Sequence, residues 1–159
     1  VDSDNNVYVL DIDRFKTDRI AEYFDHIFEL HNKWSFRKLR AEVTVAQMAI
    51  VKQLKELIKQ HGLALSIDEF RPNKQQGNKQ ERIASVLEPR YDNLQMWHYR
   101  GGNTQHLEDE LSTRNPPHDD VIDALASAVD MAVRPTRNLN RKRDSNIVWA
   151  NSRFRAGSR

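Results

Sequence analysis

Three carboxylates are crowded at the start of one apolar segment near the C-terminal end of the sequence. The segment "NPPHDDVIDALASAV" spans residues 115–129 and contains Asp119, Asp120 and Asp123. Its apolar residues recur at helical spacing, so we expect a helix whose first turn carries all three acids. Carboxylate oxygens are the ligands that Mg²⁺ prefers. One or two of them, with water and a substrate phosphate, are enough to hold the ion.

Helix capping is the competing explanation for these aspartates. The helix dipole favours anions at the N-terminal end, and "PPHDD" is a good capping sequence, with His118 or Asp119 near the cap. Capping accounts for one aspartate or two, but not for Asp123, which falls between Ile122 and Ala124 on an apolar helix. A carboxylate at the edge of a core is costly unless a cation compensates it. No lysine or arginine is near in sequence, so a divalent cation is the simplest candidate.

A fourth acid, Glu42, comes at the end of a predicted strand, "KLRAEV" (residues 38–43), directly before a helix. Binding sites in parallel α/β sheets are built at the carboxyl ends of strands, so Glu42 is the natural partner of the aspartates. Taken alone, it is better explained as a solvent-exposed charge. The other paired acids are interpreted as mostly structural: Asp11, Asp13, Asp68 and Glu69.

Other chemistries find less support in the sequence. It contains no glycine-rich phosphate loop, the six histidines lack zinc-ligand spacing, and no serine lies in a nucleophile-elbow motif. The absence of cysteine excludes disulfides and thiolate metal sites, and it fits a reducing compartment. No apolar run approaches the ~20 residues that span a bilayer, and the N-terminus does not read as a signal peptide. We therefore expect a soluble protein that is not secreted.

Strands and helices alternate along the chain and must position these acids. The predicted strands are residues 6–13, 38–43, 63–70 and 93–99; the predicted helices are residues 17–34 and 44–62, a segment that follows the loop at 71–82 and continues through Leu87, residues 104–112 and the aspartate-bearing helix. Thr44 can cap the second helix and Gly62 can end it. This alternation predicts an α/β sandwich with a partly parallel sheet.

The turn-forming stretch "DSDNN" precedes the first predicted strand. That strand is therefore expected to be the second arm of a hairpin whose first arm lies ahead of this chain, which implies at least one antiparallel pair. The 159 residues, 38% of them hydrophobic, suffice for one domain, which we assign to residues 1–133.

Residues 134–159 form a basic tail of net charge +7, which leaves −5 for the rest of a chain whose total is +2. An acidic body with a basic tail suggests a polyanionic partner. A solvated tail that binds nothing explains the charge equally well.

Four segments together resemble the nuclease domain of terminase large subunits, the DNA-packaging motors of tailed phages. "LEDELSTRNPPHDDVIDALASAV" is similar to the C-terminal motif of that domain, and "KLRAEVTVAQMAIVKQLKELI" to its acidic strand and the long helix that follows. "NKQERIASVLEPRYDNLQMWHY" looks like the segment between these motifs, and "NNVYVLDIDRFKTDRI" like the early hairpin strand. The resemblance covers residues 1–133 in the family's order, and its most specific piece is the aspartate-rich motif.

The resemblance implies an RNase H-like fold, a mixed sheet flanked by helices, and metal-dependent cleavage of duplex DNA. In the family, acids from two strands and the last helix hold two divalent cations, Mg²⁺ or Mn²⁺. Here Glu42 takes the second-strand role, Asp120 and Asp123 match the helix positions, and Asp119 either helps to hold metal or caps the helix. The family's first acid lies on the strand ahead of the hairpin, where this chain has not begun. These residues alone are therefore expected to cleave poorly or not at all.

In such an enzyme two cations roughly 3.5–4 Å apart activate a water and stabilise the leaving oxygen. Basic residues of the loop would hold phosphates without reading base sequence, unless they are merely solvated: Arg71, Lys74, Lys79 and Arg82. The tail arginines, with Trp149 and Phe154, could add contacts to DNA or to the motor.

The partners implied by the resemblance are double-stranded DNA, an ATPase motor domain in the full-length protein, the small terminase subunit and the portal, in the host cytoplasm and away from membranes. Two other functions stay open. One is a junction-resolving or transposase-like nuclease on the same fold, which would need a dimer or a junction-binding surface. The other is a catalytically silent DNA-binding or assembly module; the missing first acid favours it, while Glu42 and the aspartate cluster oppose it.

Overall fold

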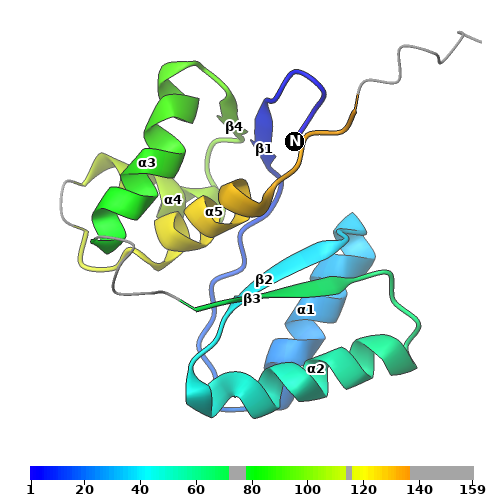
Figure 1. Cartoon of the computed structure of the whole chain (residues 1–159). Helices are drawn as coiled ribbons and strands as arrows, with labels where there is room; N and C mark the ends of the chain where they lie inside the picture. Colours follow the sequence, from blue (N-terminus) through cyan, green and yellow to red (C-terminus); the bar gives the residue numbers. More distant parts are fainter. Residues whose placement is uncertain (72–77, 114–115, 137–159) are drawn as a thin grey trace, which may run out of the picture.

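The structure is a computed structural model that describes residues 1–71, 78–113 and 116–136 (Figure 1). In this part of the chain the strands are β1 (Val7–Val9), β2 (Lys38–Glu42), β3 (Ser66–Phe70) and β4 (Met96–His98). The helices are α1 (Ile20–Trp34), the 3₁₀ helix η1 (Val45–Gln47), α2 (Met48–Gln60), α3 (Lys79–Asp92), α4 (Thr104–Ser112) and α5 (Asp120–Met131). The predicted α/β class is confirmed. Lys74, Trp149, Phe154 and most of the basic tail lie outside the described residues.

The strands pair in two separate two-stranded sheets, and both sheets are parallel. In one, β1 pairs with β4, with Val7 opposite Met96; in the other, β2 pairs with β3, with Lys38 opposite Ser66. The expected antiparallel pair does not occur among the described strands, which form two small parallel sheets instead of one mixed sheet. Parallel neighbours need a long crossover, and α2 supplies it between β2 and β3.

The residues ahead of β1 form the turn that the sequence predicted. The backbone N–H of Asp2 donates to the carbonyl of Asn6 (3.0 Å), and the N–H of Asn5 donates to the carbonyl of Asp2 (3.2 Å). The Asp2 carboxylate also accepts bonds from the backbone N–H groups of Asp4 and Asn6. Asp2 is therefore engaged within its own turn.

One hydrophobic cluster lies between α1, α2 and the β2–β3 sheet. Its buried members are Phe24, Leu54, Ile58 and Leu65. Helical spacing predicted α1 and α2 because these apolar side chains recur on one face of each helix. The predicted ends of α2 also hold. The backbone N–H of Thr44 donates to the Gln47 side chain ahead of η1, and Gly62 follows α2 at a φ of 62°.

A second hydrophobic cluster packs α3, α4 and α5 against one face of the β1–β4 sheet (Figure 1). Leu107 of α4 is completely buried at its centre. From α5, Val121, Ile122 and Val129 are buried as predicted, and Leu125 packs against the cluster partly buried. The start of α5, with its carboxylates, is therefore fixed by a core on its other side.

Arg40 of β2 joins the β2–β3 sheet to α5. Its Nε donates to Asp68 on β3 (2.8 Å), and its Nη1 donates to the carbonyl of Ser127 (3.3 Å) and to the Asp130 carboxylate on α5. The Arg40 side chain is only 15% exposed, so these bonds are largely shielded from water. They set the position of β2, and hence of Glu42 at its end, relative to α5.

Candidate functional site

The three aspartates of the predicted site lie at the first turn of α5, as the sequence indicated, but their surroundings differ. Asp119 directly precedes the helix, Asp120 begins it, and the N–H of Asp123 donates to the carbonyl of Asp119 (3.0 Å). The Asp120 side chain is 74% exposed, that of Asp119 is 36% exposed and that of Asp123 only 14%. Asp123 is thus the carboxylate at the edge of the core.

Two basic side chains of α3 compensate these acids. The Lys79 ammonium lies between Asp119 Oδ1 (2.8 Å) and Asp123 Oδ2 (3.2 Å), and Arg82 Nη2 lies 2.6 Å from Asp123 Oδ1. Burial lowers the pKa of Lys79, but the hydrogen bonds and charges of the two aspartates outweigh it, and the pKa is raised overall. The expectation that no basic residue is near Asp123 is therefore wrong. Arg82 precedes it by 41 positions, and the fold brings the two together.

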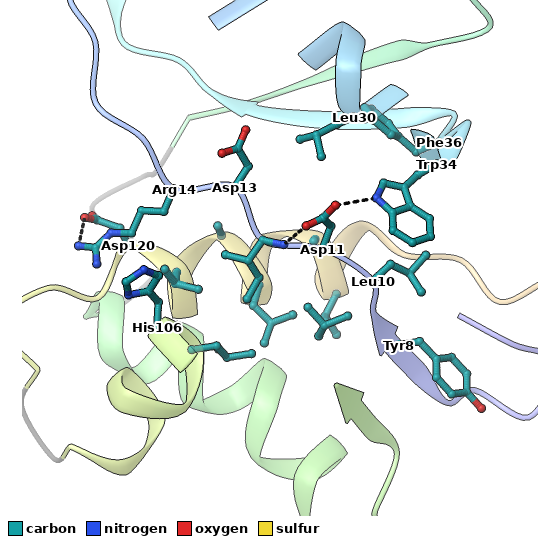
Figure 2. A pocket seen from close by; sticks show the side chains of 18 of the residues that line it. Tyr8, Leu10, Asp11, Asp13, Arg14, Leu30, Trp34, Phe36, His106 and Asp120 are labelled. Atoms are coloured by element: carbon teal, nitrogen blue, oxygen red, sulfur yellow. Dashed lines mark hydrogen bonds and ion pairs between the residues drawn. The ribbon is translucent and has the colours of Figure 1, made fainter. Parts of the chain in front are cut away.

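Asp120 points away from this pair. Its nearest cation is Arg14, from the segment between β1 and α1, with Nη2 4.0 Å from Asp120 Oδ2. Figure 2 shows both side chains at the edge of a groove that Asp119 and Asp123 do not line. Asp120 and Asp123 therefore face different surroundings despite their helical spacing.

Glu42 is the exposed last residue of β2 and stands in register with Phe70 on β3. The Phe70 ring contacts two guanidinium groups, of Arg40 at 5.4 Å and of Arg82 at 5.2 Å. Because Arg82 also binds Asp123, a continuous chain of contacts leads from the strand end that carries Glu42 to the acids of α5. No direct contact between Glu42 and these acids is found among the described residues.

We tested whether these acids form the predicted metal site. No group of three or more histidine, aspartate or glutamate side chains in the described part of the chain is arranged to hold a metal ion. The two-ion centre of Glu42, Asp120 and Asp123 is thus not assembled in this arrangement. Asp119 and Asp123 do share one cation, the Lys79 ammonium. Two carboxylates with open access to water fit a single hard cation such as Mg²⁺.

The basic residues of the predicted loop separate into three cases. Lys79 and Arg82 belong to the acid cluster, as given above. Arg71 follows β3 and is exposed, with Nη2 3.6 Å from the sulfur of Met48. Lys74 lies outside the described residues. The structure therefore brings together half of the set.

The sequence did not predict the role of Glu110, the buried acid that caps α5. Only 6% of this residue is exposed, and its Oε2 accepts hydrogen bonds from the backbone N–H groups of Val121 (3.0 Å) and Ile122 (2.9 Å). The Asp119 side chain makes no capping bond, so the expected cap by Asp119 is wrong. The available signal was a charge three positions after the core residue Leu107, on the same face of α4.

The groove in Figure 2 has a volume of about 1270 Å³ and lies between the two hydrophobic clusters. The segment between β1 and α1 and one face of α5 line it. Two acids of that segment tie it to α1. Asp11 accepts from Lys33 Nζ (2.7 Å) and Trp34 Nε1 (3.0 Å), and Asp13 lies 2.5 Å from His26 Nδ1. The structural interpretation of Asp11 and Asp13 agrees with these contacts.

The Asp11 contacts predict a pH-dependent contribution to stability. Hydrogen bonds from Lys33, and next from Trp34, hold the pKa of Asp11 below its usual value. A depressed folded-state pKa stabilises the fold fully above the unfolded-state pKa of about 4 and loses that stabilisation as the pH falls. Asp11→Asn is therefore expected to be less stable than the wild type near neutral pH, and the difference should shrink below about pH 4.

Urea denaturation at a series of pH values measures this difference. Asp18→Asn, at an exposed position ahead of α1, is the matched control. A stability deficit in Asp11→Asn that is the same at every pH would contradict the assignment.

No protein-family model matches the chain, and no curated protein or solved structure matches it either. Among the described residues, no helix is both long and apolar enough to cross a membrane. An inference about function therefore depends on the contacts around α5 and on the resemblance of the segments that form them.

Proposed function

We propose that the chain is a terminase-like nuclease domain that cuts double-stranded DNA by metal-dependent phosphodiester hydrolysis. One observation carries the proposal: Asp119 and Asp123 close around a single positive charge at the start of α5. This is the helix on which the resemblance to terminases expects metal ligands. Basic side chains stand directly beside these carboxylates, as a site for a phosphate ester requires.

When bound, Mg²⁺ or Mn²⁺ would activate a water and stabilise the leaving oxygen. Asp119 and Asp123 are the residues suited to hold such an ion. Glu42 and Asp120 are the remaining proposed ligands, one at the end of β2 and one facing the groove. Arg82, held against the Phe70 ring, would orient a phosphate beside the carboxylates.

The resemblance puts a further acid on a strand ahead of β1. The groove supports this part of the proposal, because it has room and an apolar lining that includes Val7, Val121 and Leu125, with Asp120 at its edge. Cleavage is therefore expected from a longer chain that includes that strand. The RNase H-like sheet, the ATPase motor, the small subunit, the portal and the host cytoplasm are proposed on the resemblance alone.

Calorimetric titration with Mn²⁺ tests the site. The wild type should bind the ion, and the double variant Asp119→Asn/Asp123→Asn should not. The control is Glu56→Gln/Glu88→Gln, which removes the same charge from exposed positions on α2 and α3. The next step is plasmid cleavage by the longer chain, which Glu42→Gln should abolish. If neither the wild type nor the longer chain binds Mn²⁺, and the longer chain does not cleave, the nuclease proposal is wrong.

One observation favours a second candidate, a catalytically silent DNA-binding or assembly module. In the described residues, every aspartate of the cluster has a basic neighbour and no third acid joins Asp119 and Asp123. DNA binding without cleavage by the longer chain would support this candidate. No observation on the described residues favours the junction-resolving or transposase-like alternative.

A further inference from the structure

We propose that the aspartates of α5 and the phosphates of DNA compete for Lys79 and Arg82, so that a divalent cation and DNA bind with positive coupling. The free protein is then electrostatically closed to DNA at this site. The inference rests on the proposed function, because it takes the cation to bind Asp119 and Asp123 and the polyanion to be DNA.

The first step is that both basic groups are already occupied. Lys79 binds two carboxylates, at 2.8 and 3.2 Å, and Arg82 binds one, at 2.6 Å. A phosphate can recruit them only by replacing these partners. The replacement is costly because the Asp123 side chain is 14% exposed, and removing the partner of a shielded charge is strongly unfavourable.

The second step is that a divalent cation removes this cost. A cation bound between Asp119 and Asp123 takes the place of the Lys79 ammonium and compensates Asp123 itself. Lys79 is then free to bind a phosphate. By thermodynamic linkage, DNA must raise the affinity for the cation by the same factor by which the cation raises the affinity for DNA.

The third step is that the two basic side chains differ in freedom. The Lys79 side chain is 42% exposed at the first residue of α3, so its ammonium can turn from carboxylate to phosphate without moving the helix. Arg82 is 20% exposed and lies over the Phe70 ring at 5.2 Å, so its position is set by packing as well as by charge. Lys79 is the exchanging group, and Arg82 is the fixed one.

Fluorescence anisotropy of a short labelled DNA duplex measures the coupling, in EDTA or in Ca²⁺, which takes oxygen ligands as Mg²⁺ does. For the wild type, Ca²⁺ should tighten DNA binding on the order of tenfold, within the usual range of coupling between sites. Asp119→Asn/Asp123→Asn should bind tightly in EDTA and show no response to Ca²⁺.

Two further variants make the test decisive. Glu56→Gln/Glu88→Gln changes the net charge equally and should keep the Ca²⁺ response of the wild type. Lys79→Met/Arg82→Met should bind weakly in either condition, with a salt dependence in Ca²⁺ reduced by about 2 phosphate contacts, a change of roughly 1.8 in the log–log slope.

The coupling is overturned if Asp119→Asn/Asp123→Asn binds DNA no tighter in EDTA than the Glu56/Glu88 control, or if no form of the chain binds the duplex. Neither readout involves cleavage. A Ca²⁺ response in a chain that does not cleave after extension would retain the coupling and remove the nuclease function. Cleavage without any Ca²⁺ response would do the reverse.

Discussion

Glu110→Ala is expected to lower the free energy of unfolding by about 2–4 kcal/mol, because it removes a charged acceptor from two backbone N–H groups at a buried helix start. Urea denaturation measures the loss. Glu110→Gln keeps an acceptor oxygen of similar reach and should lose less. Glu56→Ala, at an exposed position on α2, is the surface control and should fall within about 0.5 kcal/mol of the wild type.

The same substitution should weaken Mn²⁺ binding under conditions where the chain remains folded. Asp119 and Asp120 stand at the turn whose N–H groups Glu110 holds, so loss of the cap lets that turn fray. Partial recovery of binding in Glu110→Gln would separate this positioning from global destabilisation. If Glu110→Ala is as stable as Glu56→Ala and binds Mn²⁺ normally, the cap contributes to neither.

Leu107→Ala is expected to cost about 2–5 kcal/mol, since Leu107 is completely buried at the centre of the cluster between α3, α4, α5 and the β1–β4 sheet. Leu54→Ala deletes the same atoms from the other cluster and is the matched comparison. Native-state hydrogen exchange resolves where each loss falls.

We expect the two variants to loosen different parts of the chain. Amides of α4 and α5 should exchange faster in Leu107→Ala, and amides of α1 and α2 in Leu54→Ala. The reason is that no buried side chain belongs to both clusters, while Arg40 joins the two by polar bonds. Equal acceleration throughout the chain in both variants would show that the clusters unfold as one unit.

Local signals predicted the helices well. Apolar spacing and the Thr44 and Gly62 boundaries gave α2, and α5 begins where the acidic turn indicated. Strand length was less predictable. Residues 6–13 all have strand composition, but β1 ends at Val9, and beyond it the segment is tied to α1 through Asp11 and Asp13. Those ties are tertiary contacts, and no spacing along the sequence encodes them.

The candidate site shows the same division. Its acids were predictable because three carboxylates on an apolar helix are unusual wherever they occur. Their partners were not, because Lys79 and Arg82 reach Asp123 across the packing of α3 against α5, and they had been assigned to phosphates instead. Glu110 was missed because a buried glutamate and a surface glutamate differ only in what folds over them.

The two parallel sheets differ in how far along the chain their partners lie, and this bears on the order in which the molecule folds. Lys38 meets Ser66 across a single helix, whereas Val7 must wait for Met96. Closing the longer loop costs more entropy, and pairing between distant residues slows folding. During synthesis the unit of α1, β2, α2 and β3 can assemble while β1 still has no partner. The aspartate turn of α5, which packs on the later sheet, is then among the last parts of the chain to acquire its native surroundings.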